Sequence, residues 1–473
     1  MRNFDPYKKT ILFFLSLLNI ILMTVLFSYF WYHYFAETMY TFRFYRRGNY
    51  VVIILYAVFL IFFTRMYGAM KIGQLRRIEV ILSQYLSIFI SNLITYVIIS
   101  LLAFRFVNIL PMLFMTMGDF VITTFWTFLA GRIYGRIFKS WKILLIYGDR
   151  PATDLVYKVE ERRDKYAIHD AINVNEGIGA IAKKVKDFEA VIIGDIPSHQ
   201  RNDVLKFCYG NGIRAYVIPK ISDIIMMGSD RIHIFDTPFL LAKGYSLSFD
   251  QRFMKRALDI FLSIPMILLS SPIMLITAAA IKLYDGGSIL YRQTRCTQNG
   301  RTFSIIKFRS MVEDAEKDGI AKLASFHDAR ITPVGKLIRS TRIDELPQLF
   351  NILKGNMSFV GPRPERPEII EDYRKEMPEF EFRMRVKAGL TGFAQIYGKY
   401  NTVPYDKLKL DLFYIEHYSL WLDIKLILMT MKIIFKREST EGIDDKQTNA
   451  LKEMDDSDVH QVLQEISNKK RGD

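Results

Sequence analysis

The sequence predicts a multi-domain membrane protein: a four-helix transmembrane bundle, a Rossmann-like α/β module, and an α+β domain with a re-entrant membrane helix. Three observations predict this architecture. Long apolar stretches fill the first third of the chain, strand and helix patterns then alternate, and a proline-containing apolar run follows. Half of the 473 residues are hydrophobic, which is high for a water-soluble protein and indicates membrane segments.

Four apolar stretches within residues 1–140 are the predicted transmembrane helices. Their approximate bounds are 10–35, 50–69, 80–105 and 109–131. Each approaches or exceeds the ~20 residues that a helix needs to cross a bilayer. Buried helices of a soluble core are the alternative, but four such runs in succession rarely pack in water. We expect no cleavable signal peptide, because the first run is too long and lacks a small-residue cleavage site.

Basic residues set the predicted orientation of these helices. They lie before the first helix, between the second and the third, and after the fourth, and include Lys8, Lys9, Arg76, Arg77, Arg132 and Arg136. By the positive-inside rule these segments are cytoplasmic, so both ends of the bundle face the cytoplasm. Arg43, Arg46 and Arg47 lie in the first outer loop and oppose this orientation.

The net charge of +15 is interpreted as cytoplasmic flanks together with an anionic surface or a phosphate substrate. No nucleic-acid-binding motif is present, so we expect no nucleic acid partner. The two cysteines, Cys208 and Cys296, are far apart in the sequence. They exclude a disulfide framework and a thiolate metal site.

Residues 141–245 are predicted to form the Rossmann-like module. The segments "KILLIYG", "AVIIGDI" and "RAYVIP" are strand-like, and helical patterns separate them, as in an open parallel sheet. The turn "YGDRPATD" lacks the G-x-G-x-x-G fingerprint of dinucleotide binding. A nucleotide site stays an alternative, but a regulatory or dimerising role is favoured, which leaves a homodimer open.

The apolar run 260–284 is predicted to be a re-entrant membrane helix. Ser271 and Pro272 lie near its centre, and a proline there removes a backbone donor and bends the helix. Lys255 before the run and Arg292 and Arg295 after it all favour the cytoplasm. A helix that enters the membrane, breaks and returns satisfies both flanks. A kinked full span is the alternative, and it would carry the rest of the chain outside.

The last domain, residues 252–436, mixes short strands and amphipathic helices and includes this run. The remaining residues, 437–473, form a polar tail that we expect to be a loosely held helix or disordered. No function is assigned to the tail.

The chemistry is predicted to centre on two adjacent carboxylates, Asp344 and Glu345, in "STRIDELPQLFNILK". We expect Asp344 at or near the start of a helix, where the helix dipole and free N–H groups favour an anion and lower its pKa. Helix capping alone is the ordinary explanation of such a pair.

Basic residues accompany the acidic pair, which capping does not explain. They are Lys307, Arg309, Arg339, Arg342 and Arg363. Lys307 and Arg309 share one face if "IIKFRSM" is a strand. Arg363 lies between two prolines, and a rigidly held arginine suits bidentate phosphate recognition. Together these residues predict a site for a phosphorylated substrate at the bilayer surface, where a carboxylate binds a divalent ion or attacks phosphorus.

Residues 252–436 resemble the bacterial sugar transferases, the monotopic type of polyprenyl-phosphate phosphoglycosyl transferase. The motifs that carry the resemblance are "KRALDI", Ser271-Pro272, "YRQTR", "FSIIKFRSM", "RITPVGKLIRSTRIDELPQLFNILKGNMSFVGPRP", "GLTGFAQIYGK" and "DLFYIEHYSLWLDIKLILMT". The whole chain resembles the large form of this family, which adds four membrane helices and a Rossmann-like module.

The resemblance implies transfer of a sugar 1-phosphate from a UDP-sugar to undecaprenyl phosphate, with release of UMP, as the first membrane step of surface polysaccharide (exopolysaccharide or capsule) synthesis. It implies that Asp344 is the nucleophile and forms a covalent aspartyl-phosphosugar, while Glu345, with Asp344, holds Mg²⁺. Further basic residues would contact phosphates or shape the site: Lys307, Arg309, Arg339, Arg342, Arg363 and Arg295. Ser271-Pro272 would be the break of the re-entrant helix.

The same resemblance implies a multi-pass protein of the bacterial cytoplasmic membrane, in contact with membrane lipid, with its catalytic domain on the cytoplasmic face. No motif decides between glucose, galactose and an N-acetylated sugar. A non-catalytic membrane scaffold of polysaccharide machinery is the alternative of another class, and the presence of both acids argues against it.

Two positions depart from the family pattern. Thr297 stands where the family often has glycine, and Ala388 precedes Gly389 where it often has proline. Both positions lie in predicted loops outside the acidic pair.

Overall fold

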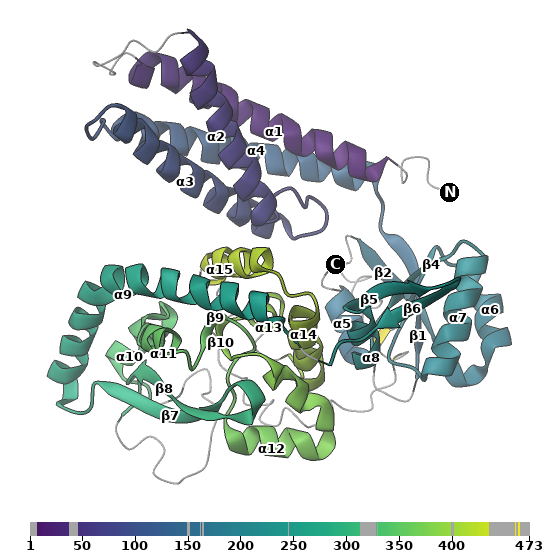
Figure 1. The fold of residues 1–473 in the computed structure, drawn as a ribbon. Coiled ribbons are helices and arrows are strands. Elements are labelled where there is room, and N and C mark those ends of the chain that lie inside the picture. The colour runs from purple at the N-terminus through teal and green to yellow at the C-terminus, as the bar shows by residue number, and fades with distance from the viewer. Residues whose placement is uncertain are drawn as a thin grey trace. The chain divides into compact units, whose positions relative to one another are not determined.

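The computed structural model describes residues 7–36, 46–148, 152–160, 162, 165–244, 246–312, 328, 330–398, 402–434, 459 and 462–463. The chain divides into two compact units. The first comprises Met1–Ile218 with Asp455–Asp473, and the second comprises Pro219–Met454. Figure 1 shows the elements of both units.

The first unit begins with four long apolar helices. They are α1 (Lys8–Phe30), which continues into the π-helical turn Trp31–Phe35, α2 (Arg46–Met66), α3 (Arg77–Leu102) and α4 (Leu110–Ile137). Helix α1 packs against α2 and α4, and α3 packs against the same two helices. Met23, Phe27, Tyr56 and Ile88 are buried between them, while many apolar side chains face outward.

Among the described residues, five helices are long and apolar enough to cross a membrane: α1 with its π-helical turn, α2, α3, α4 and α9 (Phe249–Asp285). Apolar side chains that point away from a protein core are expected where lipid, not water, surrounds the helix. Together with the α/β organisation that follows, this pattern is that of a membrane protein.

A parallel α/β sheet completes the first unit. Its elements are β1 (Trp141–Tyr147), α5 (Thr153–Glu160), β2 (Tyr166–Asn173), the 3-10 turn Val174–Glu176, α6 (Ile178–Val185), β3 (Ala190–Ile193), α7 (Ser198–Gly210) and β4 (Arg214–Val217). The strand order is β2-β1-β3-β4, and all pairs are parallel. Strands separated by helices pair in this way because each crossover helix covers a face of the sheet.

The two faces of this sheet are covered differently. Helices α6 and α7 cover one face, with Val185 and Cys208 in its core. Helix α5 covers the other face together with Val459, Val462 and Leu463 from the C-terminal segment. These three residues of the predicted polar tail therefore pack on the sheet, and the rest of residues 437–473 lies outside the described part of the chain.

The second unit contains α8 (Ile221–Met227), β5 (Asp230–Ile234), β6 (Thr237–Leu241), α9, β7 (Leu290–Cys296), the 3-10 turn Gln298–Gly300, β8 (Thr302–Phe308), α10 (Pro333–Ser340), the 3-10 turn η5 (Ile343–Glu345), α11 (Gln348–Lys354), β9 (Ser358–Val360), α12 (Pro367–Glu376), the 3-10 helix Pro378–Arg385, β10 (Gly389–Thr391), α13 (Phe393–Tyr397), α14 (Pro404–Glu416) and α15 (Leu420–Ile434). Strands β5 and β6 and strands β7 and β8 pair antiparallel, whereas β9 and β10 are parallel. Its core joins α11, β9, α14 and α15 through Leu349, Val360, Leu412 and Leu426.

Helix α9 stays helical through Pro265 and Pro272 and bends instead of breaking into two helices. It spans 37 residues, and Figure 1 shows that it changes direction in mid-course. Pro272 has no N–H for the carbonyl of Leu268, and the Ser271 hydroxyl donates to that carbonyl at 2.8 Å. The serine thereby satisfies the acceptor that the proline leaves free, as polar side chains do in membrane helices. Leu269, three residues before Pro272, is 79% exposed.

The first half of α9 is attached to the core by buried polar contacts. Lys255 forms a buried ion pair with Asp423 of α15, with 2.6 Å between Nζ and Oδ2. Arg256 donates to two carbonyls at the C-terminal end of α11, both at 2.7 Å. Asp259 accepts hydrogen bonds from the Ser358 hydroxyl and from a backbone N–H of β9, each at 2.9 Å. This long apolar helix is thus joined to the elements that carry the site described next.

Candidate active site

The acidic pair lies in the 3-10 turn η5, between α10 and α11, and not at the start of a helix. Helix α11 begins at Gln348 after Pro347, so Asp344 lies near the helix start, as expected, but in the turn that precedes it. Arg342, just before the turn, has φ 59°, a left-handed conformation that is uncommon outside glycine. This conformation redirects the chain from α10 into the turn that carries both carboxylates.

Glu345 is surrounded by basic side chains. Its Oε1 accepts hydrogen bonds from Lys307 at 3.0 Å and Arg363 at 3.2 Å, and its Oε2 lies 3.8 Å from Arg342. The side chain is only 12% exposed. Burial is the largest effect and raises the pKa of Glu345, but Lys307, Arg363 and Arg342 together hold that pKa well below its usual range. Glu345 therefore stays ionised.

Asp344 has the opposite electrostatic character. Burial, and then the neighbouring charge of Glu345, raise the pKa of Asp344 to about 6, while Lys307 and Arg339 oppose the rise. The expected lowering by a helix dipole is wrong, because α11 starts too late and desolvation dominates. The buried Oδ1 of Asp344 has no hydrogen-bond partner among the described residues. One carboxylate is thus held by cations, and the other keeps a free oxygen.

Strand β8 delivers Lys307 to the acidic pair. Asn351 of α11 donates through Nδ2 to the carbonyl of Ser304 at 2.8 Å and accepts from the N–H of Ile306 at 3.0 Å. Because Asn351 is buried, these two bonds fix the strand against the helix that follows Glu345. The hydrogen bonds between α11 and the backbone of β8 therefore fix the position of Lys307 relative to Glu345.

The loop that carries Arg363 is held by a close approach between backbones. Gly361 donates to the carbonyl of Thr391, and Gly389 donates to the carbonyl of Pro362, both at 2.9 Å. A Cβ atom on Gly361 would lie 2.3 Å from the carbonyl oxygen of Lys387, so only glycine fits.

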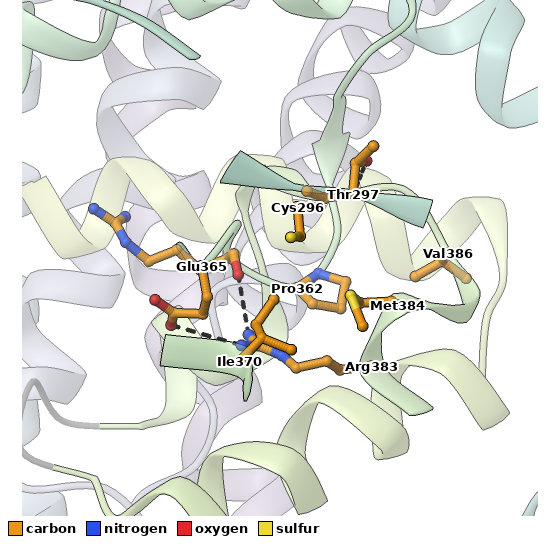
Figure 2. A pocket seen from close by; sticks show the side chains of 10 residues that line it. Cys296, Thr297, Pro362, Glu365, Ile370, Arg383, Met384 and Val386 are labelled. Atoms are coloured by element: carbon orange, nitrogen blue, oxygen red, sulfur yellow. Dashed lines mark hydrogen bonds and ion pairs between the residues drawn. The ribbon is translucent and has the colours of Figure 1, made fainter. Parts of the chain in front are cut away.

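Arg383, Glu365 and Lys407 form an ion-pair network next to this loop. Glu365 and Arg383 also line a small pocket (Figure 2). Arg383 donates to the backbone carbonyl of Arg363 at 3.0 Å and lies 3.6 Å from Glu365. Glu365 is also paired with Lys407. Burial raises the pKa of Glu365, but the charges of Lys407 and Arg383 outweigh this effect and lower the pKa to about 2. Sequence reasoning missed Glu365, Arg383 and Lys407, although Glu365 directly follows the Pro-Arg-Pro segment.

Two of the predicted phosphate-binding arginines have other partners. Arg309 is 7% exposed, pairs with Asp285 through both carboxylate oxygens, and donates from Nε to the Ser288 carbonyl at 2.6 Å. Arg295 donates to Gln293 at 2.6 Å and lies 3.9 Å from Glu365. The structure brings Lys307, Arg339, Arg342 and Arg363 to the acidic pair. Arg309 and Arg295 hold neighbouring segments, and Ser271 and Pro272 lie within α9.

The two departures from the family pattern contact each other. The Ala388 N–H donates to the Thr297 hydroxyl oxygen at 3.1 Å, and that hydroxyl donates to the Asn356 carbonyl at 3.0 Å. Proline at 388 would lack the donor, and glycine at 297 would lack the acceptor. The two substitutions therefore form one local hydrogen-bonded arrangement beside β10.

The acidic pair offers oxygen ligands of the kind that Mg²⁺ prefers. Mg²⁺ prefers oxygen ligands and is commonly held by one or two carboxylates together with substrate phosphates. Asp344 offers an unpartnered oxygen beside Glu345, which fits such a shared site. No group of three or more metal-binding side chains occurs among the described residues, so substrate oxygens would complete the shell.

The fold and the site define a membrane protein whose helix α9 is joined to a cation-lined acidic pair suited to an anionic phosphate ligand. The family model described as bacterial sugar transferase matches residues 250–437. This chain is 43% identical over 185 residues to a UDP-N-acetylgalactosamine-undecaprenyl-phosphate N-acetylgalactosaminephosphotransferase from Aeromonas hydrophila, covering 38% of this chain and 44% of that protein.

Two further relatives carry the name UDP-glucose:undecaprenyl-phosphate glucose-1-phosphate transferase. The protein from Escherichia coli (strain K12) is 39% identical, and the match covers 44% of each chain. The protein from Caulobacter vibrioides is 40% identical, and the match covers 37% of this chain and 68% of that protein. This chain belongs to the bacterial sugar transferase family. The match spans less than half the length of the Aeromonas and Escherichia proteins.

Proposed function

We propose that the protein transfers a sugar 1-phosphate from a UDP-sugar to undecaprenyl phosphate, giving undecaprenyl-diphosphate-sugar and UMP. The observation that carries this proposal is the division of roles in the acidic pair: Glu345 is held by three cations, and Asp344 keeps a free, buried oxygen. The names of the relatives supply the two substrate classes.

The first step is the attack of an Asp344 carboxylate oxygen on the phosphorus bonded to the sugar. The bond between this phosphorus and the bridging oxygen breaks, and UMP leaves with that oxygen. An oxygen of undecaprenyl phosphate then attacks the same phosphorus and releases the Asp344 carboxylate. The covalent aspartyl-phosphosugar lets a soluble and a lipid substrate use one site in turn.

Basic side chains make the approach of one anion to another feasible. A carboxylate is repelled by a diphosphate unless cations neutralise the developing charge. Lys307, Arg339 and Arg363 are placed to do so around Asp344 and Glu345. Mg²⁺ held by Glu345 and Asp344 would supply further charge neutralisation and polarise the phosphoryl oxygens.

We place this chemistry at the cytoplasmic face of the bacterial cytoplasmic membrane. Helix α9 enters the bilayer, bends at Ser271 and Pro272 and returns, so that both of its basic flanks stay in the cytoplasm. The support for this placement is the bend and the exposed apolar side chains near it, such as Leu268 and Leu269. The product would start a surface polysaccharide.

The test is a transfer assay with the purified protein, Mg²⁺, undecaprenyl phosphate and UDP-glucose, UDP-galactose or UDP-N-acetylgalactosamine. We expect at least one UDP-sugar to give a lipid-linked product and UMP. Asp344→Asn should give none, and Asp372→Asn, which changes an exposed carboxylate outside the site, should behave as wild type. A folded wild-type protein that consumes none of these UDP-sugars would contradict the proposal and favour a scaffold.

A further inference from the structure

Polar side chains from all four N-terminal helices meet inside the apolar bundle. Asp119 of α4 is fully buried there, 0% exposed, and Asn92 of α3 is 3% exposed. Asn92 donates through Nδ2 to Asp119 Oδ2 at 3.2 Å, and the Tyr56 hydroxyl of α2 donates to the same oxygen at 3.5 Å. From α1, Asn19 donates to Thr123, one helical turn from Asp119, at 3.2 Å. An ionisable group at such a depth is costly unless its charge is compensated.

No cation compensates Asp119 in the described part of the chain. No lysine, arginine or histidine there forms an ion pair with it, and Tyr56 is the titratable group that contacts it from another helix. The neighbours from the other helices, Asn92 and Asn19, are neutral. A carboxylate at this place would therefore be a buried, unpaired charge, which costs several kcal/mol or more.

Two buried oxygens in this cluster lack a hydrogen-bond donor among the described residues. These acceptors are Asp119 Oδ1 and Asn92 Oδ1. The Nδ2–Oδ2 bond already joins the two side chains, so the two unpartnered oxygens belong to residues that are in contact. A proton on Asp119 Oδ1 creates a donor, and a neutral carboxylic acid and an amide are complementary in both directions.

We propose that Asp119 and Asn92 form an intramembrane proton-binding site, in which Asp119 takes a proton from water at Oδ1 and donates it in a hydrogen bond to Asn92 Oδ1. The proton removes the buried charge and satisfies both acceptors at once, and it needs no cavity. This site is separate from the catalytic chemistry and stands independently of it.

Infrared spectroscopy of the full-length protein in nanodiscs tests the site. The spectra are recorded at neutral pH in the Asp344→Asn background, so that the active-site carboxyl does not contribute. We expect a C=O stretching band of a protonated carboxylic acid that Asp119→Asn removes. The amide has nearly the same shape as the neutral acid, so the variant should keep its fold. Asn92→Leu removes the acceptor and should shift the band to higher frequency.

A measurement without substitution at Asp119 guards against a variant that fails to fold. Incorporation of carboxyl-¹³C aspartate should shift the same band to lower frequency. The absence of any protonated aspartic acid band in the folded protein at neutral pH would overturn the proposal. So would a band that persists unchanged in folded Asp119→Asn protein.

Discussion

At the scale of single residues, two adjacent carboxylates have opposite properties because their surroundings differ. Glu345 meets Lys307, Arg363 and Arg342, and these cations outweigh its burial. Asp344 is buried beside that negative charge, and its pKa rises to about 6. The proposed reaction uses this difference: Asp344 would attack near its pKa, and Glu345 would stay an anion that holds cations. The letters "DE" alone do not reveal it.

This difference predicts the pH dependence of activity. Asp344 must be ionised to attack, so kcat/KM should rise with pH through about 6 and level off above it. Glu345→Gln removes the neighbouring charge and should lower the pKa of Asp344. The rise of its residual kcat/KM with pH should therefore occur at a lower pH than in the wild type. Steady-state rates across this pH range measure both effects. A wild-type profile that is flat through pH 6 would show that Asp344 does not titrate there.

The same shift has a consequence for stability with a defined sign. A carboxyl whose pKa is higher in the folded state than in the unfolded state favours folding most when it is protonated. The contribution of Asp344 to the free energy of unfolding should thus be lost as pH rises through about 6. Asp344→Asn should lack this loss in denaturant titrations at several pH values.

At the scale of elements, both halves of α9 are attached to segments that carry the site. Its first half is attached to α11 and β9 through Arg256 and Asp259. Its last residue, Asp285, pairs with Arg309 directly after β8, the strand that carries Lys307. A change in the course of α9 should therefore alter the positions of the side chains around the acidic pair.

Straightening α9 should lower activity. Pro272→Ala restores an N–H and removes the ring that clashes with the preceding turn, so it favours a straight helix. We expect transfer to fall and the depth of α9 in nanodiscs, measured by labelling of introduced cysteines, to change. Ser271→Ala keeps the proline and removes only the hydroxyl bond to Leu268, and it should have a smaller effect. Unchanged depth and rate in Pro272→Ala would show that the bend is dispensable.

Asp285 is predicted to position β8 through Arg309. Asp285→Asn and Arg309→Gln should each lower kcat about tenfold, which corresponds to ~1.4 kcal/mol in the activation barrier. The double variant should be little worse than either single variant, because both break one contact. If Arg309 instead binds substrate phosphate directly, Arg309→Gln should raise KM for the UDP-sugar, and Asp285→Asn should not. Initial-rate kinetics separate the two outcomes.

At the scale of the whole molecule, the catalytic unit begins earlier than the family match. Ile224 of α8 and Leu247 are buried in the same core as Leu349 and Leu412, and a Cβ on Gly228 would collide with Glu416 of α14. The second unit accordingly starts at Pro219. A cut after residue 245 would therefore remove α8 from this core.

A protein comprising residues 219–454 should therefore keep part of its transferase activity in nanodiscs. A protein comprising residues 246–454 should be less stable, because loss of Ile224 leaves a cavity that costs on the order of 2–5 kcal/mol. Thermal unfolding and transfer assays compare the two. Complete inactivity of a folded, membrane-bound 219–454 protein would mean that the first unit contributes to the site.

The sequence predicted the features that depend on local pattern. Apolar length indicated helices α1 to α4 and α9, and the alternation after Trp141 indicated a parallel sheet. Features that depend on contacts between distant segments were not predictable. Asp285 and Arg309, or Glu365 and Lys407, meet only once the chain has folded. The pKa direction of Asp344 was wrong for the same reason, since its burial is a tertiary property.

The central claim is that Asp344 forms a covalent intermediate, and isotope exchange tests it most directly. Wild-type protein is incubated with Mg²⁺, a UDP-sugar that it uses and labelled UMP, without undecaprenyl phosphate. The two-step reaction predicts that label enters the UDP-sugar, because the first step is reversible, and that Asp344→Asn abolishes this exchange. Direct attack by the lipid phosphate in a ternary complex predicts none. Absence of exchange in protein that is active with acceptor would contradict the account.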